Sequence, residues 1–117
     1  MNQRRYKGRL PYDGSNEYLE VESLIVRPNE IAYAFASVSQ VHGKWVAESG
    51  KPAVLQADGR FFVSNVFASK LGVKSTSAWT IEFVIESEDV GRSIEISGSI
   101  EEGGEAGAFY GELTHLT

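Results

Sequence analysis

The segment from Thr80 to Ile100 constrains the fold of this chain more than any other. Apolar and polar side chains alternate along it, stop alternating at residues 88–91, and then alternate again. Because successive side chains of a strand point to opposite sides, the apolar residues of each half share one face. These residues are Ile81, Phe83 and Ile85 before the break and Ile94, Ile96 and Ile100 after it. The segment is therefore predicted to be a β-hairpin with one apolar and one polar face.

Most of the remaining chain has the same character. The stretch 17–27 is also extended, with Leu19, Val21 and Ile25 expected on one face. Turn signals such as Asp58-Gly59 separate the extended stretches at short, regular intervals. No helical segments of ten residues or more alternate with them, so parallel βαβ units are not expected. We predict a single all-β domain over residues 1–117, an antiparallel meander of about eight strands.

Such a meander has two edges, and closure into a barrel removes both. The connections are of hairpin length, which favours a small closed or partly open β-barrel; a two-sheet β-sandwich is the alternative. Gly98 and Gly111 interrupt predicted strands. Strand glycines mark either the bends that curve a barrel or the space beneath a large neighbour, for which Trp45 and Trp79 are candidates.

Residues 65–72 are ambiguous. They could continue a strand, but Asn65 could also cap a short helix that Gly72 would end. We predict one short helix near 65–72.

The chain has Gly43-Lys44-Trp45 near the start of one predicted strand. With its size and meander, it resembles the small calycin-like barrels, the lipocalin and avidin group. The resemblance is one of architecture.

Charge and composition exclude several classes of function. The net charge is −5, made up of +1 over residues 1–60 and −6 over residues 61–117. Overall negative charge and few basic groups argue against nucleic-acid binding. The chain has no cysteine, so disulfides and zinc–thiolate sites are absent. No apolar run is long enough to span a membrane and no signal peptide is apparent, so we expect a cytoplasmic protein if Met1 is the natural start.

No catalytic constellation stands out. The two histidines, His42 and His115, lie far apart in the sequence, and a metal site needs three or four convergent ligands. The many carboxylates fall in turns or on polar strand faces. We expect no metal and no cofactor, and a non-catalytic domain; an enzyme whose site is invisible in one sequence is a third hypothesis.

The aromatic residues are the best candidates for binding. We expect a small apolar or planar ligand to lie at one open barrel end, oriented by a charged group. The candidate residues are Trp45, Trp79, Tyr33 and Tyr110 for stacking, and Glu112 or Arg92 for orientation. The favoured function is thus a non-catalytic binding domain, with small-ligand binding slightly ahead. The alternative is a protein-interaction module: an inhibitor, an immunity-type protein, a complex subunit or a homo-oligomer.

Overall fold

The computed structural model describes residues 4–40, 43–48, 51–70 and 76–116, and within them every regular element is a strand. The strands are β1 (Arg4–Pro11), β2 (Tyr18–Val26), β3 (Glu30–Ser39), β4 (Gly43–Glu48), β5 (Ala53–Leu55), β6 (Phe61–Lys70), β7 (Thr76–Asp89), β8 (Ser93–Glu102) and β9 (Glu105–His115). The all-β prediction is confirmed, and the Thr80–Ile100 segment forms most of the β7–β8 hairpin.

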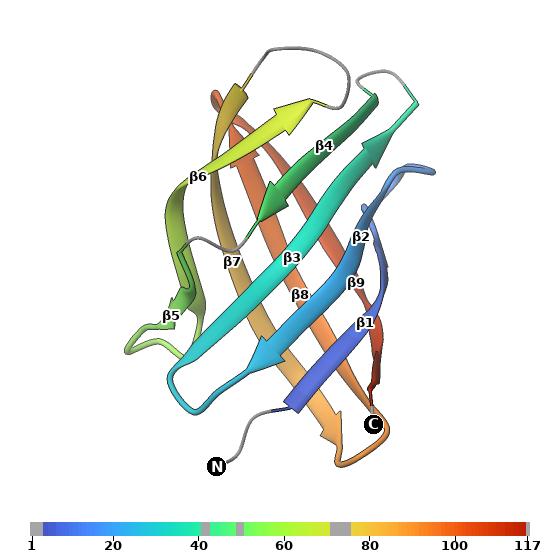
Figure 1. Cartoon of the computed structure of the whole chain (residues 1–117), viewed down its shortest axis with the longest axis vertical. Coiled ribbons are helices and arrows are strands. Elements are labelled where there is room, and N and C mark those ends of the chain that lie inside the picture. Colours follow the sequence, from blue (N-terminus) through green and yellow to red (C-terminus); the bar gives the residue numbers. More distant parts are fainter. Residues whose placement is uncertain (1–3, 41–42, 49–50, 71–75, 117) are drawn as a thin grey trace.

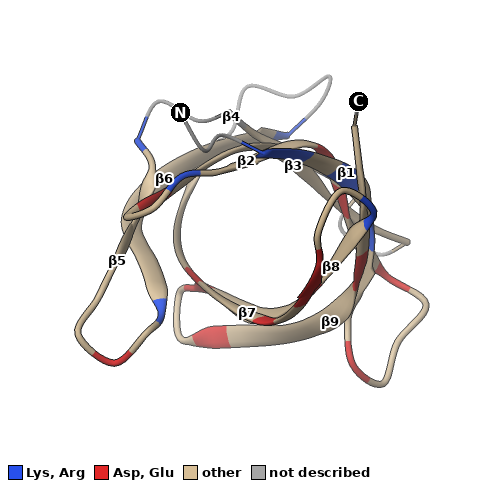
Figure 2. Cartoon of the chain, turned by 90° about the horizontal axis from the view of Figure 1, so that it is seen from below, with Lys and Arg blue, Asp and Glu red and all other residues tan. Residues whose placement is uncertain are grey.

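The strands form a closed antiparallel barrel (Figure 1). Apart from β4 and β5, each strand pairs with its sequence neighbours, and β1 pairs with both β2 and β9, which closes the ring. Viewed along its axis the ribbon encircles a single interior (Figure 2). The short strand β5 follows β4 in the same slot between β3 and β6, so nine strands fill eight positions. The barrel is thus favoured over the sandwich, as predicted.

The core fills most of the barrel interior. Alternate residues of every long strand turn inward, and the largest fully buried side chains include Tyr6, Tyr33, Phe83, Leu10 and Leu113. Burial of this apolar surface is the main stabilising contribution to the fold.

In strand β2, the prediction that Ile25 shares a face with Leu19 and Val21 is wrong. A bulge between Val21 and Ser23 shifts its register with both β1 and β3. The extra residue exchanges the two faces, so Leu24 and Val26 are buried while Ile25 is only half-buried.

The predicted helix near 65–72 is wrong for residues 65–70, which are part of β6; residues 71 and 72 lie outside the described residues. Asn65 has a φ of 56°, and the β6–β7 register shifts between Val63 and Val66. Asn tolerates this left-handed geometry, so the residue read as a helix cap forms a β-bulge instead. Past the bulge Val66 and Ala68 again face inward, while the ring of Phe67 is 69% exposed.

Gly98 and Gly111 make room for neighbouring groups, but those neighbours are not tryptophans. A Cβ on Gly98 would lie 2.1 Å from the Glu82 carbonyl oxygen and 2.8 Å from the Phe109 ring, since Phe109 is its cross-strand partner on β9. At Gly111 a Cβ would lie 3.0 Å from a methyl of Leu10.

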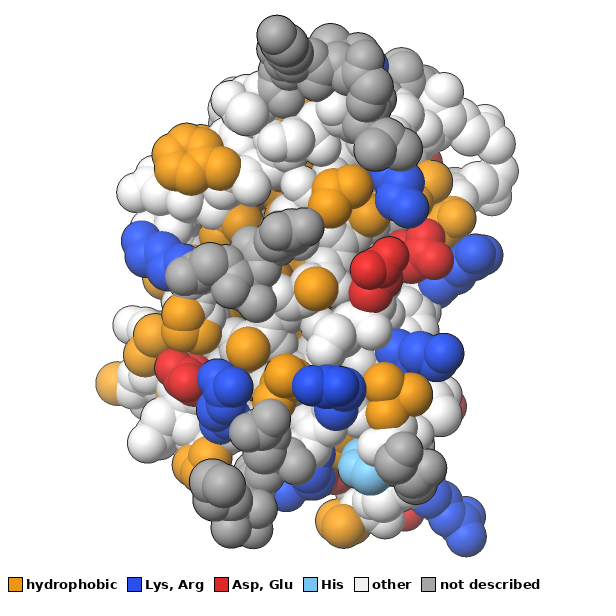
Figure 3. Space-filling model, viewed as in Figure 1, with side chains coloured by type: hydrophobic (Ala, Val, Ile, Leu, Met, Phe, Trp, Pro, Cys, Tyr) orange, Lys and Arg blue, Asp and Glu red, His pale blue; other side chains and the backbone are white. Residues whose placement is uncertain are grey.

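The two sides of the barrel differ in charge. Acidic residues concentrate on β7, β8 and β9, and basic residues on the N-terminal strands (Figure 2). On the face formed by β2, β3 and β4, exposed hydrophobic side chains stand in separate groups between polar and charged ones (Figure 3). The described part of the chain contains no helix that could cross a membrane.

Candidate functional site

A cavity of about 610 Å³ opens at one end of the barrel, where β3 and β8 finish and β4, β7 and β9 begin (uppermost in Figure 1). Ligand pockets in proteins are commonly of roughly 300–1,000 Å³, so the space suits a small molecule. It is lined by Tyr12, Asp13, Ser15, Glu17, Ser37, Ser39, Trp45, Trp79, Ile100, Glu102, Gly103, Glu105, Ala106 and Gly107.

A cluster of aromatic side chains forms the floor of the cavity and fills the middle of the barrel. Trp79 is nearly buried and stacks on Phe35, with ring centroids 6.3 Å apart and planes inclined by 8°. Phe35 meets Phe83 edge to face at 6.5 Å. Tyr33 lies within the same cluster, 5.0 Å from Phe35. These rings occupy the interior below the cavity, so the room that the cavity offers a ligand lies at the mouth.

Two further aromatic residues border the mouth. Trp45 is half-buried, packs against the edge of the core and lines the cavity. The Tyr12 hydroxyl shares a hydrogen bond of 2.8 Å with Ser37 Oγ, and its ring meets Phe109 edge to face at 6.3 Å. Burial, helped by the negative charge of Glu17, raises the pKa of Tyr12, so its hydroxyl stays neutral at physiological pH.

Glu102 is held in place by two hydrogen bonds. Trp79 Nε1 donates to its Oε2 at 3.1 Å, and Ser77 Oγ donates to its Oε1 at 2.6 Å. Glu102 pairs across the hairpin with Glu105. Glu102 is two residues from the inward-facing Ile100, so the period-two spacing directs its carboxylate toward the mouth. The carboxylate of its cross-strand partner Glu105 lies on the same side. Two like charges directly opposite each other are locally unfavourable in an antiparallel pair.

Two more carboxylates join them. Glu17 is half-buried and accepts a hydrogen bond of 2.7 Å from Ser39 Oγ, while Asp13 is exposed at the rim. Among the described residues, none of the four carboxylates that line the cavity is within ion-pair distance of a lysine or arginine.

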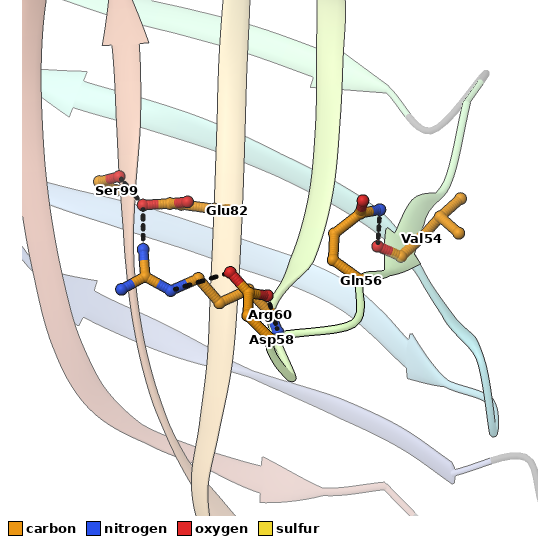
Figure 4. A network of polar contacts seen from close by, with 6 residues as sticks. All are labelled: Val54, Gln56, Asp58, Arg60, Glu82 and Ser99. Atoms are coloured by element: carbon orange, nitrogen blue, oxygen red, sulfur yellow. Dashed lines mark hydrogen bonds and ion pairs between the residues drawn. The ribbon is translucent and has the colours of Figure 1, made fainter.

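Two carboxylates elsewhere on the barrel form ion pairs with arginines. On the outer face Glu82 accepts from Arg60 Nη1 at 3.0 Å and from Ser99 Oγ at 3.3 Å (Figure 4). Near the opposite end of the barrel, Glu88 lies 2.7 Å from Arg4 Nε. The mouth thus gathers negative charge in a concave site where the field is focused, and within the described ranges no ion pair offsets this charge.

Of the residues predicted to bind a ligand, the structure brings Trp45 and Trp79 to the cavity. Tyr33 is buried beneath it, with its hydroxyl donating to the Lys51 carbonyl at 2.9 Å, and burial raises the pKa of Tyr33 to about 12.

The other three predicted residues lie away from this cavity. Tyr110 and Glu112 are exposed, and the hydroxyl of Tyr110 donates to Glu95 on the outer face of the barrel. Arg92 is exposed in the turn between β7 and β8, at the opposite end. These three residues do not meet the tryptophans.

Sequence reasoning missed the acidic residues of the mouth. The sequence pattern predicts that the carboxylates, Glu102 and Glu105 among them, fall in turns or on polar strand faces. The alternation of side chains along the strand could have located Glu102. Counting in steps of two from Ile96 and Ile100 places Glu102 on the inward face.

The described lining of the cavity is aromatic, hydroxyl-bearing and acidic, with no histidine, lysine or arginine among the lining residues. Within the described ranges, no group of three or more Asp, Glu or His side chains is arranged to hold a metal ion.

Comparison of the chain with protein-family models, with characterised proteins and with solved structures finds no match.

Proposed function

We propose that this protein is a non-catalytic binding domain that takes a small ligand into the cavity at the end of its barrel. The observation that carries the proposal is the cavity of about 610 Å³ bordered by Trp45 and Trp79. Sites of this kind combine apolar walls with a few polar groups that fix orientation. Here indole and phenol rings supply the walls, and carboxylates and serine hydroxyls supply the polar groups.

The depth of the cavity limits the ligand. Below Trp79 the interior is filled by side chains, so the site accepts one end of a molecule and leaves the rest near solvent. This differs from the hollow interior that the resemblance to calycin-like barrels would offer a fully enclosed ligand. A cytoplasmic location stays a prediction from the sequence.

The test uses tryptophan fluorescence, because both tryptophans of the chain line the cavity. Non-fluorescent fragments of neutral, positive and negative charge are titrated into the protein. We expect members of the set to change the emission saturably, and Trp45→Ala to weaken their binding severalfold. Phe67→Ala is the matched control, since it removes an aromatic ring that is 69% exposed. Absence of any saturable change across the set contradicts the proposal.

The second candidate function is a protein-interaction module, of which a dimer of this chain is the simplest form. The observation that favours it is the exposure of Phe67, together with Phe62 and Val54, which pair across β5 and β6 and are 39% and 47% exposed. Exposed aromatic rings are enriched in protein interfaces. Light scattering over a range of concentrations tests it: a mass above 12.8 kDa that rises with concentration supports self-association. A constant monomer mass contradicts the dimer.

A further inference from the structure

The mouth of the barrel combines aromatic surface with concentrated negative charge. Four carboxylates, from Asp13, Glu17, Glu102 and Glu105, line the same cavity as Trp45. We infer that the ligand of this cavity is an organic cation, an ammonium or guanidinium group carried on an apolar or aromatic body. The inference rests on the proposed function, since it names the class of ligand for that cavity.

The paired glutamates at the end of the β8–β9 hairpin favour a cation over an anion. Glu102 and Glu105 face each other in the last pair of the β8–β9 hairpin, and like charges in such a pair repel. The hydrogen bonds from Trp79 and Ser77 fix Glu102 in place. A bound cation would relieve this repulsion, whereas an anion would add to it.

Among the described residues, no lysine or arginine competes for the carboxylates of the mouth. Lys70 pairs with Trp45 at the end of β6, but it does not line the cavity and makes no ion pair with its carboxylates. The outer-face Glu82, by contrast, is already paired with Arg60. As far as the described residues go, no cation of the chain occupies the charge at the mouth.

The aromatic lining of the cavity also suits a cation. Tryptophan is the side chain that attracts cations most strongly through its ring face, and tyrosine follows. One face of Trp79 is covered by Phe35, so the half-buried Trp45 and Tyr12 offer the accessible rings. Aromatic rings beside carboxylates attract an ammonium group that also carries apolar surface.

The arrangement favours an organic cation over a metal ion. A bound metal needs several ligand atoms that converge at roughly 2.0–2.6 Å. Within the described residues no cluster of acidic or histidine side chains meets that need. The carboxylates come from the β1–β2 turn, the approach to β2 and the β8–β9 hairpin, and their spread suits an extended ligand.

The experiment compares three small molecules that share a phenyl ring and a two-carbon or shorter arm: 2-phenylethylammonium, 2-phenylethanol and phenylacetate. Binding is followed through the two indole N–H signals in ¹⁵N–¹H NMR spectra. We expect the ammonium to bind about tenfold more tightly than the alcohol, and the acetate more weakly than both. Added salt weakens binding of the ammonium and leaves the alcohol unchanged.

Two glutamate variants test the role of the mouth. Glu105→Gln removes a lining charge, and we expect it to weaken ammonium binding roughly two- to fivefold without affecting the alcohol. Glu101→Gln is the matched control: it removes the same charge from the neighbouring β8 position, which is exposed and does not line the cavity, and should change affinity less than twofold.

Each outcome has a distinct meaning. If the alcohol binds as tightly as the ammonium, the cation preference is wrong and the proposed binding function stands. If Glu101→Gln weakens binding as much as Glu105→Gln, the attraction comes from the overall charge of the barrel, and the inference is likewise wrong. If none of the three molecules shifts either indole signal, both the inference and the proposed function are contradicted.

Discussion

Substitution of Gly98 by alanine should destabilise the barrel more than any other glycine-to-alanine change in its strands. The added Cβ would lie 2.1 Å from the Glu82 carbonyl oxygen and 2.8 Å from the Phe109 ring. The ring can rotate, but the carbonyl belongs to the backbone of the neighbouring strand β7. Relief therefore requires β7 and β8 to separate locally by about 1 Å in a close-packed interior.

The cost follows from two contributions. Overpacking of a core costs about 1–3 kcal/mol, and each weakened ladder hydrogen bond adds about 1 kcal/mol. We expect Gly98→Ala to lower the free energy of unfolding by about 3 kcal/mol and the melting temperature by about 10 °C or more. Urea unfolding followed by circular dichroism measures the first quantity.

Gly111→Ala is the matched comparison. A Cβ there would meet a flexible methyl of Leu10 at 3.0 Å and the Arg9 carbonyl oxygen at 3.4 Å. A small movement of the leucine accommodates it, so we expect a loss of about 1 kcal/mol. If Gly98→Ala costs less than about 1 kcal/mol, or no more than Gly111→Ala, the close approach of β7 to β8 is not as described and the reasoning fails.

Two further predictions concern titration and the mouth. Burial raises the pKa of Tyr33 from 10.0 to about 12. The stabilisation of the fold by the neutral Tyr33 hydroxyl is therefore complete below pH 10 and is lost as the pH rises towards 12. The free energy of unfolding should fall by at most ~3 kcal/mol over this pH range. In urea titrations at pH 9–12, Tyr33→Phe should flatten this part of the plot of unfolding free energy against pH. Glu102→Ala leaves the buried Trp79 Nε1–H without its partner and should cost about 1 kcal/mol. The Trp79 indole signal should shift upfield in NMR spectra; an unmoved signal would show that the hydrogen bond is absent in solution.

The strands could be predicted because their alternation is strong, and closure because the connections are short. The bulges could not. At Val21 and at Asn65 one extra residue exchanges the inward and outward faces. A period-two pattern with apolar residues on both faces does not show where such an exchange occurs, so Ile25 was assigned to the wrong side.

The candidate site could be predicted only in part, because strands with apolar residues on both faces do not show which face turns inward. Trp45 and Trp79 lie at one barrel end as expected, but β9 carries an aromatic residue on each face, Phe109 inside and Tyr110 outside. Only the register with β8 distinguishes the two. Charged residues beside a tight turn are usually solvated, and Glu102 is exposed as well, but this turn forms the rim of a cavity that its carboxylate lines.

The proposed ligand site is the cavity at this end of the barrel and not the outer face of the barrel. Backbone ¹⁵N–¹H NMR shifts during a titration with 2-phenylethylammonium test it most directly. We expect the largest shifts to cluster at the cavity lining, around Tyr12, Ser37, Trp45, Trp79 and Glu102. Shifts concentrated on the exposed outer strands, at the β7–β8 turn, or nowhere would contradict it.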